Sequence, residues 1–484
     1  MTSSTIGLGI IGAGVIGETF CQAFTLHGAY KVLAVCDANP QRATSLAHKF
    51  QAEAYSSYEE LLQRTDIQLI YLGIPPKYHS DFFRAAVEAG KHVLCEKPLC
   101  LSNEEAATMT RVAEEASSRG IVTAINYPLH YVKALAQFKQ LLAAGYAGEL
   151  RRINLKLHFP HWPRAWQNYQ RTDWINCREQ GGPLREIGSH FFFALLSLLA
   201  GHDALSRVNA HVHYPADPTQ QAAETSVLGS IALGSGGFVQ VDLLSDLPSL
   251  AETVELTAHG TQGTISLVDF QTLLVAKNNE DLRLYDETNK IAPNQLMSSA
   301  FVVEEMAQAI LHRRDTPSRW NLVPIKTGAQ VQRILQALYH SQGQWIDLAE
   351  PASNSITYLT AEQITKPLPI FSHASSYQGL VHVSCIQGFI PGTFDFPSSD
   401  AAEQAEQVLK NLQTVLRQSN SDLKRILKLT IYFVAMQEDF PGVNAVINRY
   451  FPEHPPARSS LGVAELPRNA RIVMDCTAAR LDFG

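Results

Sequence analysis

Apolar runs in the first part of the chain are separated by helix-like stretches. The run Ile6–Ile11 leads into a glycine turn and a helical stretch, and a second run ends at Asp37. Later apolar runs, each preceded by a predicted helix, lie at Leu69–Ile74, His92–Cys95 and Val122–Ile125. Strands that are apolar throughout and separated by helices are typical of a parallel sheet covered on both faces. We therefore predict an α/β domain over residues 1–125.

In the next part of the chain, polar and apolar residues alternate one by one. The alternation is clearest in Arg152–Phe159 and Val208–Tyr214. Further strands are predicted near Thr225–Leu233, Gly237–Leu243 and Thr253–Ala258. A period of two indicates an antiparallel sheet with one face in water. We expect this α+β domain to span residues 126–345 and to close with helices at about Phe301–Arg313 and Ile325–Gln342.

The remaining chain divides into a connecting stretch and a small domain. Residues 346–370 are rich in proline, serine and asparagine, which predicts a linker. Residues 371–484 are numerous enough for an independent small domain. Its predicted elements are strands at Leu380–Ser384, Leu427–Val434 and Arg471–Thr477 and helices at Ala401–Ser419 and Val443–Tyr450.

The composition is that of an ordinary globular protein. Hydrophobic residues make up 45% and charged residues 18% of the 484 residues, which excludes bulk disorder. The 39 Lys and Arg against 46 Asp and Glu give a formal net charge of −7, so we expect neither nucleic acid nor a membrane as partner. The longest apolar helical run, Phe191–Ala200, has half of the roughly 20 residues that a membrane span requires.

The chain start and the cysteines bear on the compartment. The first residues show no basic stretch with a cleavage site, so we expect a cytoplasmic protein. Seven cysteines without a Cys-x-x-Cys pair indicate buried free thiols. His158 and His161 lack a carboxylate or cysteine partner at fixed spacing, and we predict no metal. The nearby Trp162, Arg164 and Trp166 either line a substrate site or pack at an interface, and the sequence leaves both open.

A Gly-x-Gly-x-x-Gly turn links the first predicted strand to the first helix. Gly12 permits the tight turn, Gly14 lets the backbone approach a pyrophosphate, and Gly17 lets helix and strand pack closely. Asp37 lies 20 residues after Gly17, at the end of the next strand, where a carboxylate accepts hydrogen bonds from a ribose 2′-hydroxyl. This pattern predicts NAD as cofactor, while Arg42 keeps NADP as an alternative.

Loops after two further strands complete the predicted cofactor site, because an open parallel sheet binds ligands beyond the carboxyl ends of its strands. One loop begins at Ile74 and the other contains Glu96–Pro98. The predicted cofactor contacts are Gly12, Gly14, Val15, Ile16, Gly17, Asp37, Arg42, Ile74, Pro75, His79, Glu96 and Lys97.

Four motifs over about residues 5–345 resemble the Gfo/Idh/MocA family of glucose–fructose oxidoreductases and inositol dehydrogenases. They are the glycine turn, the Glu-Lys-Pro signature within Gly90–Pro98, Gly148–Leu150 and Gly181–His190. The resemblance implies an NAD(P)-dependent oxidoreductase with a Rossmann domain and a sheet domain. By the same resemblance Lys97 is a catalytic or substrate-orienting lysine and His190 the acid/base histidine.

The chemistry of these residues fits that assignment. Hydride transfer to or from a carbon that bears oxygen or nitrogen needs a matching proton transfer, and a histidine titrating near pH 7 suits it. Glu186 stands where the family usually has aspartate, four residues before His190, so on a helix both side chains project from one face. We predict Lys97, His190 and Glu186 as the catalytic residues.

The last 114 residues resemble a second family, the Rid proteins, small trimeric hydrolases of enamines and imines. The resemblance rests on Leu380–Ser384, Ala405–Leu412, Val443–Phe451 and above all Pro455–Ser459. It implies an α+β, chorismate-mutase-like fold. It also implies a carboxylate pocket made by Arg458, whose planar guanidinium suits a carboxylate, with Asn444 and Ser384 beside it.

This chain departs from the Rid pattern at three positions. The family's tyrosine aligns with Phe371, a glycine with Cys385, and the glutamate thought to position water with Val473. Valine can neither accept a proton nor hold a water for attack. We therefore expect the domain to bind carboxylates or to oligomerise the enzyme rather than to hydrolyse imines, although Asp475 lies on the same side of the strand.

Together these observations predict an NAD(P)-dependent oxidoreductase that acts on a C=N or C=O carbon of a small polar substrate. The fused Rid-like domain favours an imine derived from an amino acid. The alternatives are a sugar or polyol dehydrogenase with a structural Rid-like domain, and an NAD-binding scaffold without turnover. We expect a homo-oligomer with contacts through the Rid-like domain and the sheet of the second domain.

Overall fold

The computed structural model divides the chain into two compact units, Met1–Ala349 and Glu350–Gly484. The structure describes residues 5–164, 173–217, 219, 221–285, 295–311, 320–348, 356–361, 363–367, 371–377 and 379–480. Within this part of the chain, no helix is long and apolar enough to cross a membrane.

Unit 1 begins with the Rossmann sheet, which confirms the predicted α/β fold. In the described residues its six strands are all parallel and follow the order β3-β2-β1-β4-β5-β6. The strands are β1 (Ile6–Ile11), β2 (Tyr30–Cys36), β3 (Glu53–Tyr55), β4 (Leu69–Leu72), β5 (His92–Glu96) and β6 (Thr123–Asn126). The helices are α1 (Val15–His27), α2 (Pro40–Phe50), α3 (Tyr58–Leu62), α4 (His79–Glu88) and α5 (Asn103–Ser118).

The strand order of this sheet predicts where a ligand binds. Every residue of β1 and β4 is buried, as expected of strands covered by helices on both faces. The chain runs outward from β1 in one direction to β3 and in the other to β6. Ligands of such sheets bind beyond the carboxyl ends of the strands where the order reverses, which here is between β1 and β4.

The second sheet also belongs to unit 1. Its nine described strands have the order β14-β13-β12-β11-β7-β10-β9-β8-β15. Its pairs are antiparallel, as the alternation predicts, with the exception of β7 and β10, which run parallel. The strands are β7 (Leu150–Phe159), β8 (Leu205–His213), β9 (Ser226–Leu233), β10 (Phe238–Ser245), β11 (Thr253–Gly260), β12 (Gly263–Val268), β13 (Thr272–Lys277), β14 (Arg283–Leu284) and β15 (Ile346–Asp347).

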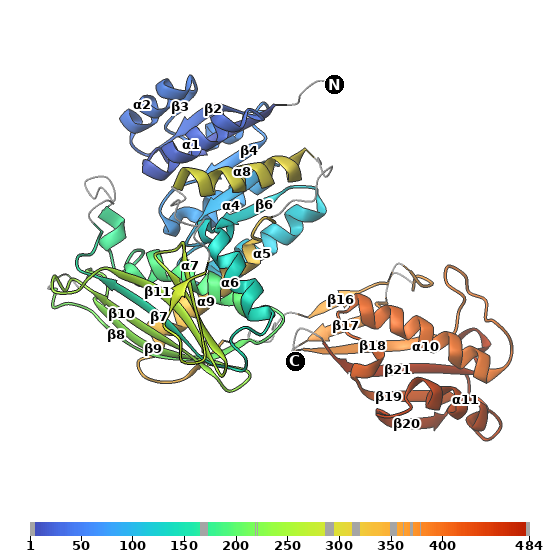
Figure 1. The fold of residues 1–484 in the computed structure, drawn as a ribbon. Helices are drawn as coiled ribbons and strands as arrows, with labels where there is room; N and C mark the ends of the chain where they lie inside the picture. Colours follow the sequence, from blue (N-terminus) through green and yellow to red (C-terminus); the bar gives the residue numbers. More distant parts are fainter. Residues whose placement is uncertain are drawn as a thin grey trace. The chain divides into compact units, whose positions relative to one another are not determined.

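Helices join the two sheets of unit 1 (Figure 1). The helical elements after β6 are η2 (Pro128–Tyr131), α6 (Lys133–Ala143), η4 (Asp173–Asn176), the π-turn η5 (Leu184–Gly188), α7 (Ser189–Leu199), α8 (Gln295–Ile310) and α9 (Ile325–His340). Helix α8 returns to the Rossmann sheet and lies beside α1, where Val302, Val303 and Met306 share a core with β1. Helix α9 packs against α5, α7 and β8.

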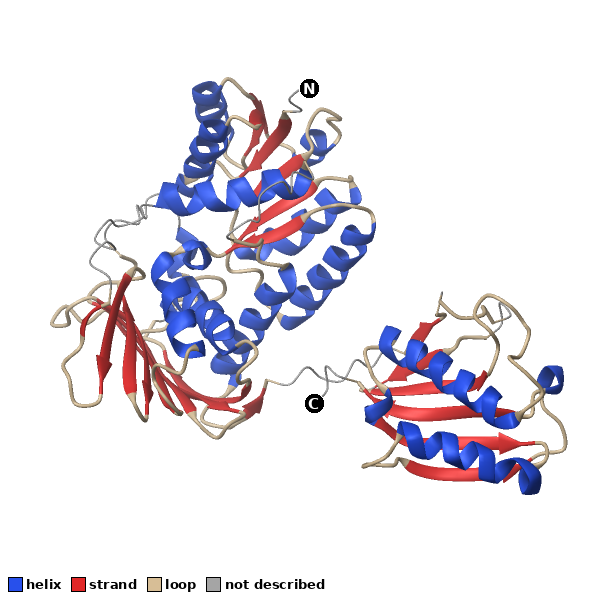
Figure 2. Cartoon of the chain, turned by 45° about the vertical axis from the view of Figure 1, so that its right-hand side comes forward, coloured by secondary structure: helices blue, strands red, loops and turns tan. Residues whose placement is uncertain are grey.

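Unit 2 has its own core and a mixed sheet. In the described part of the unit, the strand order is β16-β17-β18-β21-β19-β20, with only β19 and β20 parallel. The elements are β16 (Thr357–Leu359), β17 (Ala374–Tyr377), β18 (Leu380–Gln387), α10 (Ala401–Gln418), η7 (Leu423–Arg425), β19 (Ile426–Phe433), α11 (Met436–Tyr450), β20 (Ala457–Gly462), η8 (Pro467–Asn469) and β21 (Ile472–Ala479). Helices α10 and α11 lie on one face of the sheet (Figure 2).

Two short strands lie in the stretch predicted as a linker. Strand β15 pairs with β8 at the edge of the second sheet. Strand β16 pairs with β17 and so extends the sheet of unit 2. Both strands therefore belong to the sheets of folded units.

Candidate functional site

The glycine turn has the shape that a dinucleotide requires. Gly12 has φ +108°, and a Cβ there would lie 2.2 Å from the carbonyl oxygen of Gly73. A Cβ on Gly17 would lie 2.0 Å from the carbonyl oxygen of Gly12. Helix α1 can therefore pack this closely on the turn only because both positions are glycine. A Cβ on Gly14 would meet nothing within 4 Å. Gly14 also begins α1 with no side-chain cap, which leaves backbone N–H groups for a pyrophosphate.

Asp37 lies directly after β2 and faces this turn. Its carboxylate accepts hydrogen bonds from the backbone N–H of Ala13 (2.8 Å) and of Asn39 (2.8 Å). Val15 is half exposed at the start of α1, and Arg42 lies in the first turn of α2. These positions fit a cofactor whose pyrophosphate meets the turn and whose ribose meets the carboxylate.

His79 joins two loops in the interior. The side chain is fully buried, and its ring nitrogens lie 2.8 Å from the carbonyl oxygen of Ile74 and 3.1 Å from that of Leu99. Burial lowers the pKa of His79 below its ordinary value. Because both ring nitrogens face backbone carbonyls, His79 shapes the loop that carries Ile74 and Pro75 and offers no polar atom to a cofactor.

Glu96, at the end of β5, forms hydrogen bonds to residues of both neighbouring strands. Its buried carboxylate accepts hydrogen bonds from Tyr71 Oη on β4 (2.9 Å) and Asn126 Nδ2 on β6 (2.7 Å). It also accepts one from the backbone N–H of Lys97 (3.2 Å). Burial raises the pKa of Glu96. The carboxylate therefore fixes the peptide that carries Lys97.

Lys97, which directly follows β5, forms an ion pair with Glu186 of η5. Lys97 Nζ lies 3.1 Å from Glu186 Oε2 and 3.1 Å from the Glu186 carbonyl oxygen. The side chains are only 14% and 7% exposed, so this ion pair is shielded from water and from salt. Glu186 lies in the π-turn η5, a kind of helical irregularity that is frequent at functional sites.

His190 follows in the first turn of α7. Its ring meets the rings of Tyr127 and Phe270 edge-on, with centroids 6.4 Å and 5.9 Å apart. Burial, and secondarily the positive charges of Lys97 and Arg164, hold the pKa of His190 well below the ordinary 6.5. A histidine in this state is neutral at pH 7 and can accept a proton.

Several polar atoms of this cluster lack a hydrogen-bond partner among the described residues. They are Asn126 Oδ1, Tyr127 Oη, Glu186 Oε1, Ser189 Oγ and His190 Nδ1. Leaving such a buried group unpaired costs about 1–3 kcal/mol. The cluster is therefore suited to a polar ligand or to bound water.

The residues predicted for the carboxylate pocket of unit 2 are only partly brought together. Arg458, exposed on β20, donates a hydrogen bond from Nη1 to Asn444 Oδ1 on α11 (2.8 Å). Ser384 Oγ instead donates to the backbone carbonyls of Ser372 and His373. Val473 is buried on β21, so no carboxylate occupies the position of the missing glutamate.

Comparison with known families decides the identity of both units. Residues 6–124 match "Oxidoreductase family, NAD-binding Rossmann fold" and residues 135–266 match "GFO/IDH/MocA C-terminal domain". Residues 362–480 match "Endoribonuclease L-PSP". The chain belongs to the Gfo/Idh/MocA oxidoreductases. It is an NAD(P)-dependent oxidoreductase of that type with a C-terminal Rid domain, as the motifs predict.

Individual relatives give the same division. D-glucoside 3-dehydrogenase of Escherichia coli strain K12 is 24% identical over 356 residues, 70% of this chain and 96% of that protein. Reactive Intermediate Deaminase A, chloroplastic, of Arabidopsis thaliana is 39% identical over 120 residues, 25% of this chain and 64% of that protein. The structure of levoglucosan dehydrogenase in complex with NADH and levoglucosan shares the fold, with TM-score 0.59, 20% identity and coverage of 72% and 100% of the two chains.

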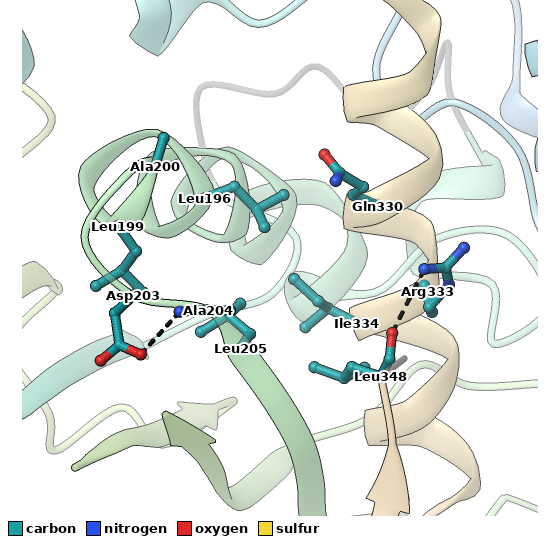
Figure 3. Close-up of a pocket in the computed structure, with 10 residues that line it drawn as sticks. All are labelled: Leu196, Leu199, Ala200, Asp203, Ala204, Leu205, Gln330, Arg333, Ile334 and Leu348. Atoms are coloured by element: carbon teal, nitrogen blue, oxygen red, sulfur yellow. Dashed lines mark hydrogen bonds between the residues drawn. The ribbon is translucent and has the colours of Figure 1, made fainter. Parts of the chain in front are cut away.

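A cavity of about 300 Å³ lies between α7 and α9 (Figure 3). Leu196 and Leu199 of α7 and Ile334 of α9 line its apolar part. At its rim an Arg333 N–H donates to the carbonyl oxygen of Leu348 (3.4 Å). The cavity shares no residue with the predicted cofactor or catalytic residues.

Sequence reasoning missed several residues of the oxidoreductase site. Asn126 and Tyr127 stand at the carboxyl end of β6, so the rule that selected Ile74 and Glu96 also applies to them. Phe270 comes from a loop without a recognisable pattern. Arg164, which the sequence left open between a substrate site and an interface, is near enough for its charge to act on His190. Trp162 is buried against Phe159 (5.5 Å between ring centroids), whereas Trp166 lies outside the described residues.

Proposed function

We propose that this oxidoreductase interconverts a secondary alcohol and a ketone in a small, many-hydroxylated substrate of the sugar or polyol class. The observation that carries the proposal is the buried Lys97–Glu186 pair beside a neutral His190. The names of the similar D-glucoside 3-dehydrogenase and levoglucosan dehydrogenase support the substrate class.

The residues divide the chemistry as follows. The nicotinamide, when bound, accepts or donates a hydride at C4. In alcohol oxidation the substrate C–H supplies that hydride, and His190 accepts the hydroxyl proton as the C=O bond forms. Lys97 donates a hydrogen bond to the same oxygen and stabilises negative charge there. Glu186 orients Lys97, and Asp37 binds the ribose hydroxyls, which favours NAD over NADP.

Reduction of a C=N bond is the second candidate. The observation that favours it is the fusion to a Rid domain, whose relative in Arabidopsis carries the name Reactive Intermediate Deaminase A. In that reaction the hydride adds to carbon, and a proton that His190 takes up from solution passes to nitrogen. Lys97, Glu186 and His190 would act in both reactions, so the two candidates have to be separated by testing substrates of each class.

One experiment tests both candidates. NAD reduction is followed with polyols, glucosides and anhydrosugars, and NADH oxidation with cyclic imines and 2-imino acids, using the full chain. We expect turnover with a member of the first group. Turnover with imines alone would replace the sugar proposal by the second candidate. Tight NADH binding with no turnover in either group would favour a cofactor-binding scaffold.

For unit 2 we propose carboxylate binding and self-association without imine hydrolysis. Buried Val473 in place of a glutamate supports the loss of hydrolysis. Exposed apolar side chains on and beside β19 and β20 support self-association: Leu427, Val434 and Leu461. Light scattering of the full chain tests the association, and a monomeric mass at micromolar concentration would refute it.

A further inference from the structure

Glu224, just before β9, contacts the first residue of the π-turn that carries Glu186. Its side chain is buried, with 1% of its surface exposed. Glu224 Oε1 accepts hydrogen bonds from the backbone N–H of Leu184 (2.8 Å) and from Tyr339 Oη on α9 (3.2 Å). One carboxylate therefore connects the start of the turn, helix α9 and the second sheet.

The turn needs such a partner at this end. Leu184 begins the continuous helical segment η5–α7, and the first N–H groups of a helix have no acceptor within it. Pro183, which precedes Leu184, has no side-chain cap to offer. A carboxylate at this end accepts the orphan N–H and complements the positive end of the helix dipole.

The residues beside the turn leave room for the Glu224 carboxylate. Gly182 has φ +96°, and a Cβ there would lie 2.3 Å from Glu224 Oε2. Arg185 Nη1 donates to the carbonyl oxygen of Gly181 (3.0 Å), and its guanidinium carbon lies 5.0 Å from the Tyr339 ring centre. The charges of Arg185 and Glu224 interact, and Tyr214 also lies near Glu224, in addition to the Tyr339 that donates to it.

We propose that Glu224 is a positioning residue for hydride transfer, which acts by holding the turn that presents Glu186 to Lys97. Leu184 stands two residues before Glu186, whose carboxylate and carbonyl oxygens both hold Lys97 Nζ at 3.1 Å. A shift of about 1 Å in a catalytic group can cost about 100-fold in rate. The inference rests on the proposed function for the role of Lys97.

The first test needs no substrate. Acetic anhydride is used as the probe, and acetylation of Lys97 is measured by peptide mass spectrometry in the full chain. In Glu224→Leu the turn loses its acceptor and Lys97 loses its partners, so we expect its acetylation to accelerate about tenfold. Glu224→Gln retains an acceptor oxygen, and we expect a change within about twofold.

The matched control is Ser341→Ala, which removes two other hydrogen bonds of unit 1. Ser341, two residues after Tyr339, accepts through Oγ from the backbone N–H of Ala210 (2.7 Å) and donates to the carbonyl oxygen of Gln344 (2.5 Å), and neither bond involves the turn. We expect this variant to leave Lys97 acetylation unchanged at a comparable loss of thermal stability. Equal acetylation of Lys97 in Glu224→Leu and Ser341→Ala would overturn the proposal.

The second test uses whichever substrate the panel identifies. We expect Glu224→Leu to lower kcat about 100-fold, with KM for the cofactor within about twofold of wild type. Glu224→Gln should recover most of kcat. If the leucine variant does not fold, Glu224→Asp keeps the charge but retracts the carboxylate from Leu184, and the same losses are expected. A kcat loss no larger than that of Ser341→Ala would refute positioning, while absence of any substrate would refute only the proposed function.

Discussion

The two polar sites of this protein differ in how far they are removed from water. Lys97 and Glu186 are almost completely buried and hold each other at 3.1 Å, whereas Arg458 is exposed and donates one hydrogen bond to Asn444 Oδ1. In a low-dielectric site the same charges interact several times more strongly than at a surface. Burial therefore favours catalysis at the first site, and we expect the second site to bind a ligand without turning it over.

The difference extends to the proton-transfer groups. The first site has His190, kept neutral by burial and by nearby cations. In the second, Val473 occupies the position of the expected base, and the neighbouring Asp475 accepts a hydrogen bond from Tyr432 Oη (2.9 Å). That bond and burial raise the pKa of Tyr432 to about 12, so the Tyr432 hydroxyl stays protonated at neutral pH and does not act as a base.

The largest expected effect follows from removing the buried charge. Lys97→Met eliminates the donor to the reacting oxygen and leaves Glu186 unpaired, so we expect kcat to fall about 100- to 1000-fold. Cofactor binding, measured by NADH fluorescence, should change little because the glycine turn is intact. Lys139→Met, at an exposed position on α6, is the control. Wild-type turnover in Lys97→Met would show that the chemistry takes place elsewhere.

Removing the proton acceptor is expected to cost about 100-fold in kcat, in the variant His190→Ala. The pH dependence sharpens this prediction. A base works in its neutral form, and the lowered pKa keeps His190 neutral below the ordinary 6.5. The alcohol-oxidation rate of the wild type should therefore stay level from neutral pH down past 6.5 and decline only in more acidic solution. A decline centred above 6.5 would contradict the burial of His190.

The fold of both units could be predicted from the sequence because their patterns are local. Continuous apolar runs gave the Rossmann sheet, and period-two alternation gave strands such as β7 and β10. The parallel pairing of β7 with β10 depends on contacts between distant segments, which periodicity does not encode. Helix α11 begins at Met436, seven residues before the predicted Val443, and contains Pro441.

The site was predictable only where a motif or a strand end marks it. The glycine turn, Asp37 and Lys97 carry such marks. His79 fits the rule for strand ends but is buried between two loops, because a side chain's direction is not contained in the rule. Glu224 reaches the turn from 40 residues away in sequence, and only the folded structure brings it there.

Cofactor choice is a smaller effect, set at the edge of the first site. Asp37→Ser removes a charged acceptor for ribose hydroxyls, and we expect the preference for NAD over NADP to fall about 10- to 100-fold. The ratio of kcat/KM for the two cofactors measures it. Glu53→Gln, which changes an exposed carboxylate on the neighbouring β3, should leave the ratio unchanged. An unaltered ratio in Asp37→Ser would mean that the carboxylate serves only Ala13 and Asn39.

The smallest expected effect concerns the exposed site, and it tests whether the two sites are independent. Arg458→Ala should abolish binding of a small 2-oxo acid such as 2-oxobutanoate, measured by calorimetry, because the guanidinium is the carboxylate's partner. Hydride transfer should stay within about twofold of wild type, since a surface substitution in a unit with its own core perturbs little else. Tyr358→Ala, at another exposed position of unit 2, is the control for nonspecific effects. A loss of hydride transfer in Arg458→Ala alone would mean that the Rid domain supplies or senses a ligand of the oxidoreductase, and the division into a catalytic and a binding site would have to be replaced by a coupled pair.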